Sequence, residues 1–348
     1  MPPGAASRPT LHDVAREARV GVMTVSRVVN GEPSVRPETA ARVRTAIAKL
    51  GYQPNDAARS LKGQRSRTLG LVIADITNSF YAGCAKAIEE VARSHGYAVI
   101  LCDSGEQVDI ERQQVDVLAR RRVDGLLLVP AANGHAYLAD ERLAEVPVVA
   151  LDRPIPGIPT DAVVVQNRRG AREATEHLIG HGHRHIAYIG AGERLYTTRE
   201  RRVGYREALK AAGLTEMSWV DAADSAAAER AMRDALALPT PPTAVFAMNN
   251  LITIGVLQAL DHLGLRAPHD VALIGFDDFD LAALLHPRLT LVRQPAAEMG
   301  RRAAKLLFDR LEGRSPKPVQ RVVLATELIV RESCGCRHDR PAVQCTNG

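Results

Sequence analysis

The chain has 348 residues, 46% of them hydrophobic, so it is long enough to form two or three domains with sizeable cores. Its formal net charge of +5 is unevenly placed, because residues 1–67 hold 12 Lys/Arg and only 5 Asp/Glu, which indicates a polyanionic partner for this part. No signal peptide or membrane-spanning run is visible, and the five cysteines form no disulfide framework, so we expect a cytoplasmic protein without a membrane partner.

The stretch Thr10–Gly31 has apolar residues at helical spacing, with one interruption near Arg19–Gly21. We therefore expect two short helices joined by a tight turn. Thr10 can cap the first helix through its hydroxyl, and Asp13 places a carboxylate near the positive end of that helix. The second helix is too short to bury much, but its polar face suits the edges of bases. This pattern is typical of a helix-turn-helix, and the polar residues concerned are Thr24, Ser26, Arg27 and Asn30.

Two further helices are predicted before the chain changes character. Glu38–Leu50 has the apolar spacing of a third helix, which Gly51 ends. Asn55 can cap a short helix over Asp56–Lys62, but this helix would be barely stable alone and needs a partner. Residues 62–67 are polar and basic, which is typical of a linker.

From Thr68 onward, short apolar strands alternate with amphipathic helices, which predicts parallel sheets with helices on both faces. The alternation stops after residue 152 and restarts near Arg169, so we expect two similar lobes with a cleft between them. The predicted strands are 68–76, 97–103, 123–130, 147–152, 185–190, 243–248 and 271–278, and the predicted helices are 82–94, 111–121, 169–180, 200–212 and 251–263.

The N-terminal motif resembles the DNA-binding headpiece of the LacI/GalR (lactose-repressor) family, and Tyr52–Leu61 follows at the family's distance. Where the family usually has Gly-Val-Ser in the turn, this chain has Arg19-Val20-Gly21. An arginine at the glycine position costs roughly 1 kcal/mol if its φ is positive. The residues that carry the resemblance are Thr10, Leu11, Asp13, Val14, Ala15, Ala18, Val20, Thr24, Val25, Ser26, Arg27, Val28, Asn30 and Gly31.

The resemblance covers nearly the whole chain and implies its domain organisation. The headpiece and a hinge helix would precede an α/β core with two parallel sheets, similar to periplasmic sugar-binding proteins. A homodimer is expected, because operator reading requires two-fold symmetry and no leucine heptad follows Arg331. The implied segments are a flexible N-terminus (1–9), the headpiece (10–54), the hinge helix and linker (55–67), the core (68–333) and a disordered tail (334–348). Within the core, lobe one would be about 68–165 and 294–324, lobe two about 166–293 and 325–333, with crossings near Val165–Arg168, Val292–Gln294 and Leu324–Glu327.

The resemblance also implies double-stranded operator DNA as a partner. Val22, Met23 and Arg27 would face the major groove. Leu61 would enter a central base step from the minor groove when two hinge helices pack together on DNA. The expected DNA contacts are Thr10, Val22, Met23, Thr24, Ser26, Arg27, Asn30, Tyr52, Asn55, Ala58, Arg59, Leu61 and Lys62.

Ligands of open parallel sheets bind outside the carboxyl ends of the strands, where this chain has many polar residues. Aromatic, amide, carboxylate and guanidinium groups together suit a polyhydroxylated ring, and each position matches a ligand-contacting position of the family. The family commonly has Asn-Asp where this chain has Asn249-Asn250, and the arginines can take an anionic group, so a sugar acid or related metabolite competes with a neutral sugar. The expected effector contacts are Asn78, Phe80, Tyr81, Asp152, Arg153, Arg199, Asn249, Asp277 and Gln294.

Cofactor binding and catalysis are weaker interpretations. Gly190-Ala191-Gly192 lacks the third glycine of a dinucleotide-binding motif, so no cofactor is expected. Asp277, Asp278 and Asp280 have no matched acid or nucleophile beside them, so no catalytic residue is assigned.

Metal binding is also a weaker interpretation. His181, His183 and His185 are expected to close a loop and cap the preceding helix. The tail motif Cys334-Gly335-Cys336, with His338 and Cys345, lacks the paired CxxC spacing of zinc sites. No metal site is therefore assigned, and the sequence leaves open whether the tail cysteines bind metal.

Two functions of different classes fit these features. The leading one is a ligand-responsive transcriptional repressor of a carbohydrate or sugar-acid operon, which binds a pseudo-palindromic operator as a dimer. The alternative is a sugar-binding receptor or a sugar-active enzyme on the same two-lobed core. The basic headpiece and linker favour the regulator, because neither a receptor nor an enzyme needs them. Its effector could act as an inducer or as a corepressor.

Overall fold

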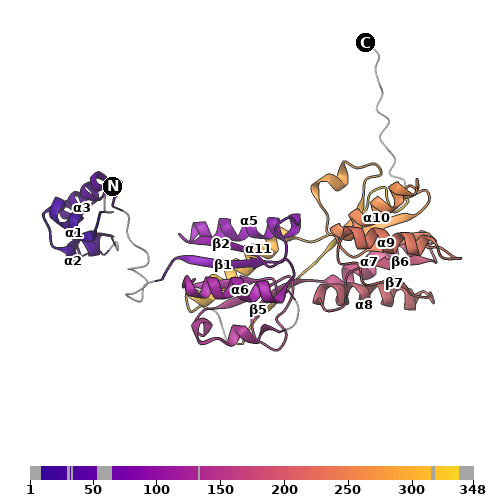
Figure 1. Cartoon of the computed structure of the whole chain (residues 1–348), viewed down its shortest axis with the longest axis horizontal. Coiled ribbons are helices and arrows are strands. Elements are labelled where there is room, and N and C mark those ends of the chain that lie inside the picture. Colours follow the sequence, from indigo (N-terminus) through magenta and orange to yellow (C-terminus); the bar gives the residue numbers. More distant parts are fainter. Residues whose placement is uncertain are drawn as a thin grey trace, which may run out of the picture. The chain divides into compact units, whose positions relative to one another are not determined.

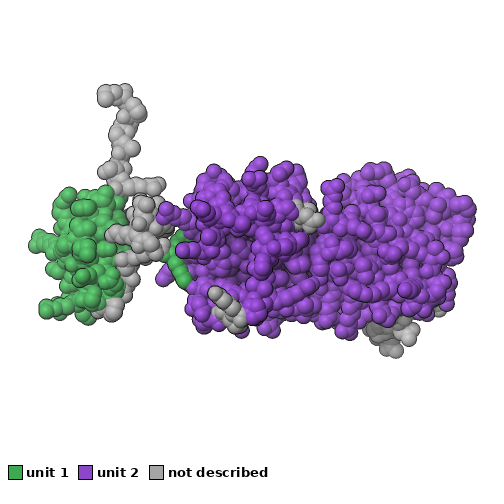
Figure 2. Space-filling view, turned by 90° about the horizontal axis from the view of Figure 1, so that it is seen from below, with its two compact units in different colours: residues 1–66 green, residues 67–348 purple. Residues whose placement is uncertain are grey.

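The computed structural model describes residues 9–29, 32, 34–52, 65–131, 134–314 and 318–336. The chain divides into two compact units, Met1–Ser66 and Arg67–Gly348, which Figure 2 shows in different colours. Among the described residues, no helix is long and apolar enough to cross a membrane.

The first unit contains the helices α1 (Leu11–Ala18), α2 (Val22–Val29) and α3 (Pro37–Leu50). Thr10 caps α1 as predicted, because its hydroxyl accepts a hydrogen bond from the Asp13 N–H. The Asp13 carboxylate in turn accepts from the Thr10 N–H at 2.9 Å. This reciprocal capping box satisfies N–H groups that a helix leaves free at its start. Hydrogen bonds from Thr10 also hold the pKa of Asp13 below its usual range.

The turn after α1 contains the arginine in place of glycine. Arg19 has φ 52° and ψ 49°, the left-handed conformation for which the sequence predicted a cost of roughly 1 kcal/mol. Its N–H donates to the Arg16 carbonyl and closes α1. The Gly21 carbonyl then accepts from the N–H groups of Thr24 and Val25, which starts α2. The three helices pack on Val14, Ala15, Ala18, Val25, Val43, Ala46 and Tyr52.

Lobe one of the second unit is a wholly parallel sheet covered by helices on both faces (Figure 1). Its strands are β1 (Thr68–Ile73), β2 (Ala98–Asp103), β3 (Gly125–Leu128), β4 (Val148–Leu151), β5 (Asp161–Val165) and β11 (Arg321–Leu324), and its helices are α5 (Ser79–Ser94), α6 (Val108–Arg120) and α11 (Ala296–Leu311). The strand order is β11-β5-β4-β3-β1-β2. Leu71 packs in the cluster under α5 and α11, whereas its neighbour Val72 packs under α6, as the two-residue period of a strand requires.

Lobe two repeats this plan with one difference. Its strands are β6 (Ile186–Ile189), β7 (Met217–Trp219), β8 (Ala244–Ala247), β9 (Ala272–Phe276), β10 (Thr290–Arg293) and β12 (Glu327–Ile329), and its helices are α7 (Asn167–Gly180), α8 (Tyr196–Ala211), α9 (Ser225–Leu236) and α10 (Asn250–His262). The order is β12-β10-β9-β8-β6-β7, and β12 runs antiparallel to β10. The prediction of a parallel sheet is therefore wrong at this edge. Gly204 lets α8 lie close to α7, since a Cβ at Gly204 would be 2.1 Å from the carbonyl oxygen of Arg168.

The chain passes between the lobes three times. It leaves β5 for α7 at Gln166, leaves β10 for α11 at Gln294 and Pro295, and leaves β11 for β12 at Ala325 and Thr326. The first and third positions lie inside the ranges that the resemblance implied, and the second extends one residue beyond its range, to Pro295. In lobe two, α7, β10 and β12 are therefore the elements that begin or end at a crossing.

Several helices begin earlier than predicted, because polar caps precede the apolar pattern. Asn78 Oδ1 accepts from the Phe80 N–H at 3.1 Å, so α5 begins at Ser79. Asn249 Oδ1 accepts from the Ile252 N–H in the same way at the start of α10. Elements that the pattern did not predict are β5, β7, β10, β11, β12, α9 and α11.

The predicted tail boundary at Cys334 is wrong, because this residue lies in lobe two. Ser333 and Cys334 are fully buried. The Ser333 hydroxyl donates to the Leu273 carbonyl at 2.7 Å and accepts from the Thr290 N–H at 2.8 Å. The rest of the predicted tail (337–348), residues 1–8 of the N-terminus and the hinge helix (56–62) lie outside the described residues.

Candidate functional site

The first candidate surface is the exposed side of α2. Val25 is fully buried and fixes the helix, whereas Met23 is 68% exposed. Arg27 is also exposed, and in the described part of the chain the charged group that it approaches is Glu32, at 3.8 Å between two half-exposed side chains. Such a pair restrains the guanidinium little. Met23 and Arg27 are therefore open to a partner, while the partly buried residues of α2 among the predicted contacts are Val22, Thr24 and Ser26.

Thr10 and Tyr52, two other predicted DNA contacts, have structural roles in the first unit. Thr10 caps α1, and Tyr52 is only 7% exposed in the cluster beneath the three helices. Contact of either residue with DNA stays a prediction. The remaining predicted contacts lie outside the described residues: Asn30, Asn55, Ala58, Arg59, Leu61 and Lys62.

The second candidate site is a cavity of about 100 Å³ between the two lobes, where strands of both sheets end. Sites for drug-sized ligands usually measure roughly 300–1,000 Å³, so the lobes lie close together in this structure. Eight of the nine predicted effector contacts line the cavity, namely Asn78, Phe80, Tyr81, Asp152, Arg153, Asn249, Asp277 and Gln294.

Each lobe contributes one aspartate with an unusual backbone conformation. Asp152 directly follows β4 with φ 68°, and Asp277 directly follows β9 with φ 72°. Asp152 donates its N–H to Val163 and Asp277 donates to Val292, both at 2.9 Å, so the neighbouring strand holds each of them. A positive φ costs such residues roughly 1 kcal/mol and often marks a functional site. In both lobes this conformation places a carboxylate at the cavity.

Arg153 is the buried cation of lobe one. Its Nη1 and Nη2 donate to the Glu106 carboxylate at 2.6 Å each, and Nη2 also donates to the Tyr81 hydroxyl at 3.0 Å. Its Nε lies 3.3 Å from the Asp152 carboxylate. Burial raises the pKa of Asp152, although Arg153 opposes that shift. Two carboxylates thus neutralise the guanidinium of lobe one.

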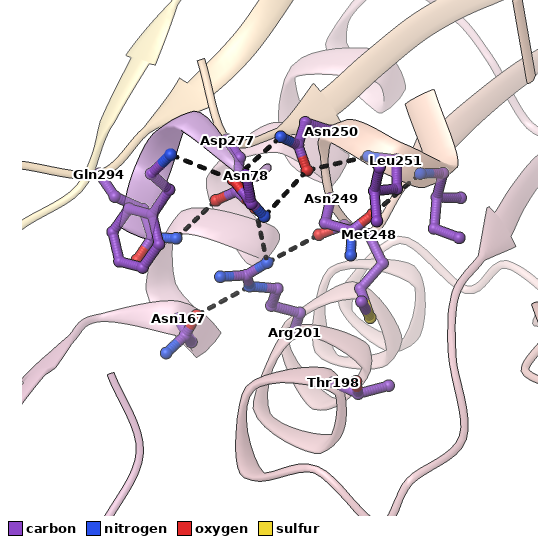
Figure 3. A network of polar contacts seen from close by, with 12 residues as sticks. Asn78, Asn167, Thr198, Arg201, Met248, Asn249, Asn250, Leu251, Asp277 and Gln294 are labelled. Atoms are coloured by element: carbon purple, nitrogen blue, oxygen red, sulfur yellow. Dashed lines mark hydrogen bonds and ion pairs between the residues drawn. The ribbon is translucent and has the colours of Figure 1, made fainter. Parts of the chain in front are cut away.

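Arg201 is the buried cation of lobe two, and Figure 3 shows it within the polar network at the cleft. Its Nε donates to Asn167 Oδ1 at 2.8 Å, and its Nη1 donates to the Met248 carbonyl at 2.9 Å. The guanidinium also lies 3.7 Å from the centre of the Phe276 ring. Among the described residues, the one carboxylate within 4.0 Å is that of Asp277, at 3.6 Å. Arg201 is therefore held mainly by neutral oxygens and an aromatic face.

Within the described residues, and apart from the bond of Gln294 to Asp277 at a crossing, two hydrogen-bonded bridges join the lobes. Asn250 Nδ2 donates to Asn78 Oδ1 at 3.1 Å, and Asn78 Nδ2 donates to Asn250 Oδ1 at 3.4 Å. Arg321 of β11 donates to the Tyr196 hydroxyl of α8 at 2.7 Å. Both bridges must break if the lobes move apart to admit a ligand.

Two buried acceptors at the cavity lack a hydrogen-bond donor within the described part of the chain. They are Asp152 Oδ1 and Gln294 Oε1. Gln294 uses its other polar atom, since Nε2 donates to Asp277 Oδ1 at 2.5 Å. A buried acceptor without a donor costs free energy, and a ligand hydroxyl at this position would remove that cost.

Arg199, the ninth predicted effector contact, lies outside this cavity. Its side chain is 52% exposed, and it lines a neighbouring surface pocket together with Tyr196. The cleft residue is instead Arg201, which the sequence analysis missed. Helical spacing could have found it, because Arg201 shares a face with the buried residues Gly204 and Tyr205 of α8.

Known proteins share both parts of this architecture. Residues 10–55 match the lacI family of bacterial regulatory proteins, and residues 175–334 match the periplasmic binding protein-like domain. The chain is 40% identical over 341 residues to the regulator CelR of Thermobifida fusca, with 94% of this chain and 98% of that protein covered. It is 36% identical over 327 residues to the ribose operon repressor of Halalkalibacterium halodurans, with 93% and 96% covered.

Solved structures show the same arrangement. The lac repressor dimer bound to operator and an anti-inducer matches with a TM-score of 0.83 at 26% identity, covering 94% of this chain and 99% of that one. The complex of CelR with cellobiose matches with a TM-score of 0.68 at 36% identity, covering 94% and 100%. The fold and the cleft define a helix-turn-helix protein with a periplasmic-binding-protein-like core, which confirms the predicted fold class. The chain belongs to the lacI family of bacterial regulatory proteins, and it is a DNA-binding regulator of transcription.

Proposed function

We propose that this regulator is a repressor whose effector is a neutral polyhydroxylated sugar bound between the lobes. The observation that carries the proposal is that two buried acceptors, Asp152 Oδ1 and Gln294 Oε1, have no hydrogen-bond donor among the described residues. Sugar hydroxyls can donate to both, and the apolar face of the ring can stack on Phe80 or Tyr81, which line the same cavity. The names of two relatives, a ribose operon repressor and CelR solved with cellobiose, support the same ligand class.

The charges around the cavity favour a neutral sugar over a sugar acid. Arg153 is already paired with two carboxylates, and Arg199 lies in another pocket. An anionic ligand would therefore enter a site with an excess of negative charge, which opposes binding. The charged groups that line the cavity are the carboxylates Asp75, Glu106, Asp152 and Asp277 and the guanidiniums Arg153 and Arg201.

For DNA, we propose that α2 reads a pseudo-palindromic operator as part of a homodimer in the cytoplasm. Met23 and Arg27 are open on α2, and a relative, the lac repressor, was solved as a dimer on its operator. A binding rather than a catalytic use of the cavity is supported by the relatives, which are named as a repressor and a transcriptional regulator.

Calorimetry with the full chain tests the effector proposal. Neutral pentoses, hexoses and disaccharides are titrated beside the matching sugar acids. We expect at least one neutral sugar to bind, and its acid to bind at least about tenfold more weakly. An operator selected from random duplexes then reports, by fluorescence anisotropy, whether the bound sugar changes DNA affinity. An acid that binds as tightly as the neutral sugar would contradict the charge argument, and sugar turnover without DNA binding would favour an enzyme.

A further inference from the structure

Two histidines from the end of α7 meet two cysteines from the segment after β12. His177 Nε2 and His181 Nε2 lie 3.4 Å and 3.0 Å from Cys336 Sγ. Cys334 Sγ lies 3.4 Å from His177 Nε2. The ligand atoms of His177, His181 and Cys336 are all within 4.8 Å of one another. Residues more than 150 positions apart in the sequence therefore form one cluster of sulfur and nitrogen donors.

These separations resemble the distances between the ligands of a tetrahedral zinc ion. With Zn–S near 2.3 Å and Zn–N near 2.0–2.1 Å, a sulfur and a nitrogen that bind the same tetrahedral ion lie about 3.5 Å apart. The observed S···N distances of 3.0–3.4 Å are slightly shorter, so small shifts of His177, His181 and Cys336 would admit the ion. Cys334 Sγ lies outside the group of atoms within 4.8 Å of one another, so its side chain would move farther to become the fourth ligand. Thiolate and imidazole donors, with no carboxylate among the four, favour zinc over magnesium or calcium. We propose that His177, His181, Cys334 and Cys336 form a zinc site in lobe two.

Local structure brings the four donors together. His177 lies in the last turn of α7 and His181 directly follows the helix, so an interval of four residues places their rings on one side, with centroids 4.7 Å apart. Gly335 separates the cysteines and has φ 90°, a left-handed conformation that glycine adopts without strain. This turn lets both sulfur atoms approach His177.

Hydrogen bonds around the cysteine segment hold it in place. The Thr290 hydroxyl of β10 donates to Cys334 Sγ at 3.1 Å. Ser333 is bonded to β9 and β10 through its hydroxyl, so the backbone before Cys334 is fixed as well. Contacts of this kind orient the ligands of metal sites and favour one geometry. The next histidine, His183, lies near a different group, since its Nδ1 is 2.9 Å from Thr243 Oγ1.

The proposed ion would connect elements that lead to the lobe crossings. It would attach the segment after β12 directly to α7, and through Thr290 it would reach β10. Among these, α7 begins and β10 ends at a crossing between the lobes, and the cysteine segment directly follows β12, which begins at one. Since the site exists only in the folded lobe, the ion would stabilise lobe two against unfolding. The zinc site does not depend on the identity of the effector.

Metal analysis of the full chain, purified under reducing conditions without chelator, tests the site. We expect one zinc per chain, and cobalt(II) in its place should give the visible absorption bands of a tetrahedral ion with thiolate charge transfer in the near ultraviolet. Cys336→Ser and His181→Gln should lose the metal. They are chosen because both side chains are at least partly exposed, whereas Cys334 is buried. The matched controls Cys102→Ser and His183→Gln should keep it.

Thermal unfolding gives an independent measurement on the same proteins. A chelator is expected to lower the Tm of the unaltered chain by roughly 5 °C or more and to leave the Tm of Cys336→Ser unchanged. An unaltered chain that binds neither zinc nor cobalt would overturn the proposal. So would an intact mass that shows Cys334 and Cys336 joined in a disulfide under the same reducing conditions. Loss of zinc in Cys345→Ser, a position outside the described residues, would overturn the choice of these four ligands.

Discussion

The two lobes build their halves of the cleft from the same parts but use their arginines differently. In each lobe a strand ends in an aspartate with positive φ, and a buried arginine lies beside it. Arg153 of lobe one is neutralised by Glu106 and Asp152, whereas Arg201 of lobe two is held by neutral oxygens and the Phe276 ring. A guanidinium paired with two carboxylates maintains the folded lobe, while one held mainly by neutral groups keeps a charge that a ligand can still meet. We therefore propose that Arg153 serves mainly stability and Arg201 mainly recognition.

The largest expected effect is on the stability of lobe one. Arg153→Met leaves the buried Asp152 carboxylate without its cation, so we expect the free energy of unfolding to fall by about 3–5 kcal/mol. Urea denaturation followed by circular dichroism measures this change. Unaltered stability together with lost sugar binding would reverse the roles of the two arginines.

A smaller effect is expected on recognition in lobe two. Arg201→Met removes donors that face the cavity, so we expect effector affinity to fall by roughly 10- to 150-fold, which corresponds to about 1.5–3 kcal/mol. Arg199→Met is the matched control, because that side chain is half exposed and lies outside the cavity, and its affinity should change by less than about twofold. Calorimetry compares the two. A large loss in Arg199→Met alone would move the ligand to the neighbouring pocket.

The smallest expected effect concerns the bridge between the lobes. Asn250→Ala removes the hydrogen bonds to Asn78, each worth about 1 kcal/mol or less, so the lobes should separate more often and the apparent effector affinity should rise about fivefold. Energy transfer between dyes placed on the two lobes reports the separation without ligand. If the dye distances of Asn250→Ala match those of the unaltered chain, the amide pair does not hold the lobes together.

Features that depend on neighbouring residues could be predicted from the sequence, and features that depend on distant ones could not. The capping by Thr10 is local, so spacing and residue type were sufficient, and the strained turn at Arg19 was indicated by the glycine that the family has there. The cavity residues followed from one rule about strand ends, which correctly located Asp152 and Asp277 beside it. The same rule does not say which face of a helix points into the cavity. Arg199 was therefore predicted as a cavity residue, although Arg201 of the same helix is the one that lines it.

Short elements and long sequence separations set the other limits. Strands β7 and β12 have only three residues each, too few to show a two-residue period. The cysteines after β12 were assigned to a tail, because nothing near them in the sequence indicates the buried Thr290 and the end of α7 that they contact.

The close approach of α7 and α8 has a consequence for how the regulator tolerates mutation. Gly204 touches no ligand, yet any side chain there would push the two helices apart, because a Cβ would overlap the Arg168 carbonyl. Asn167 on α7 and Arg201 on α8 are joined at 2.8 Å, so separating the helices would also pull the guanidinium out of the cleft. A genetic screen for repressors that no longer respond to their signal would therefore recover substitutions behind the pocket as well as within it.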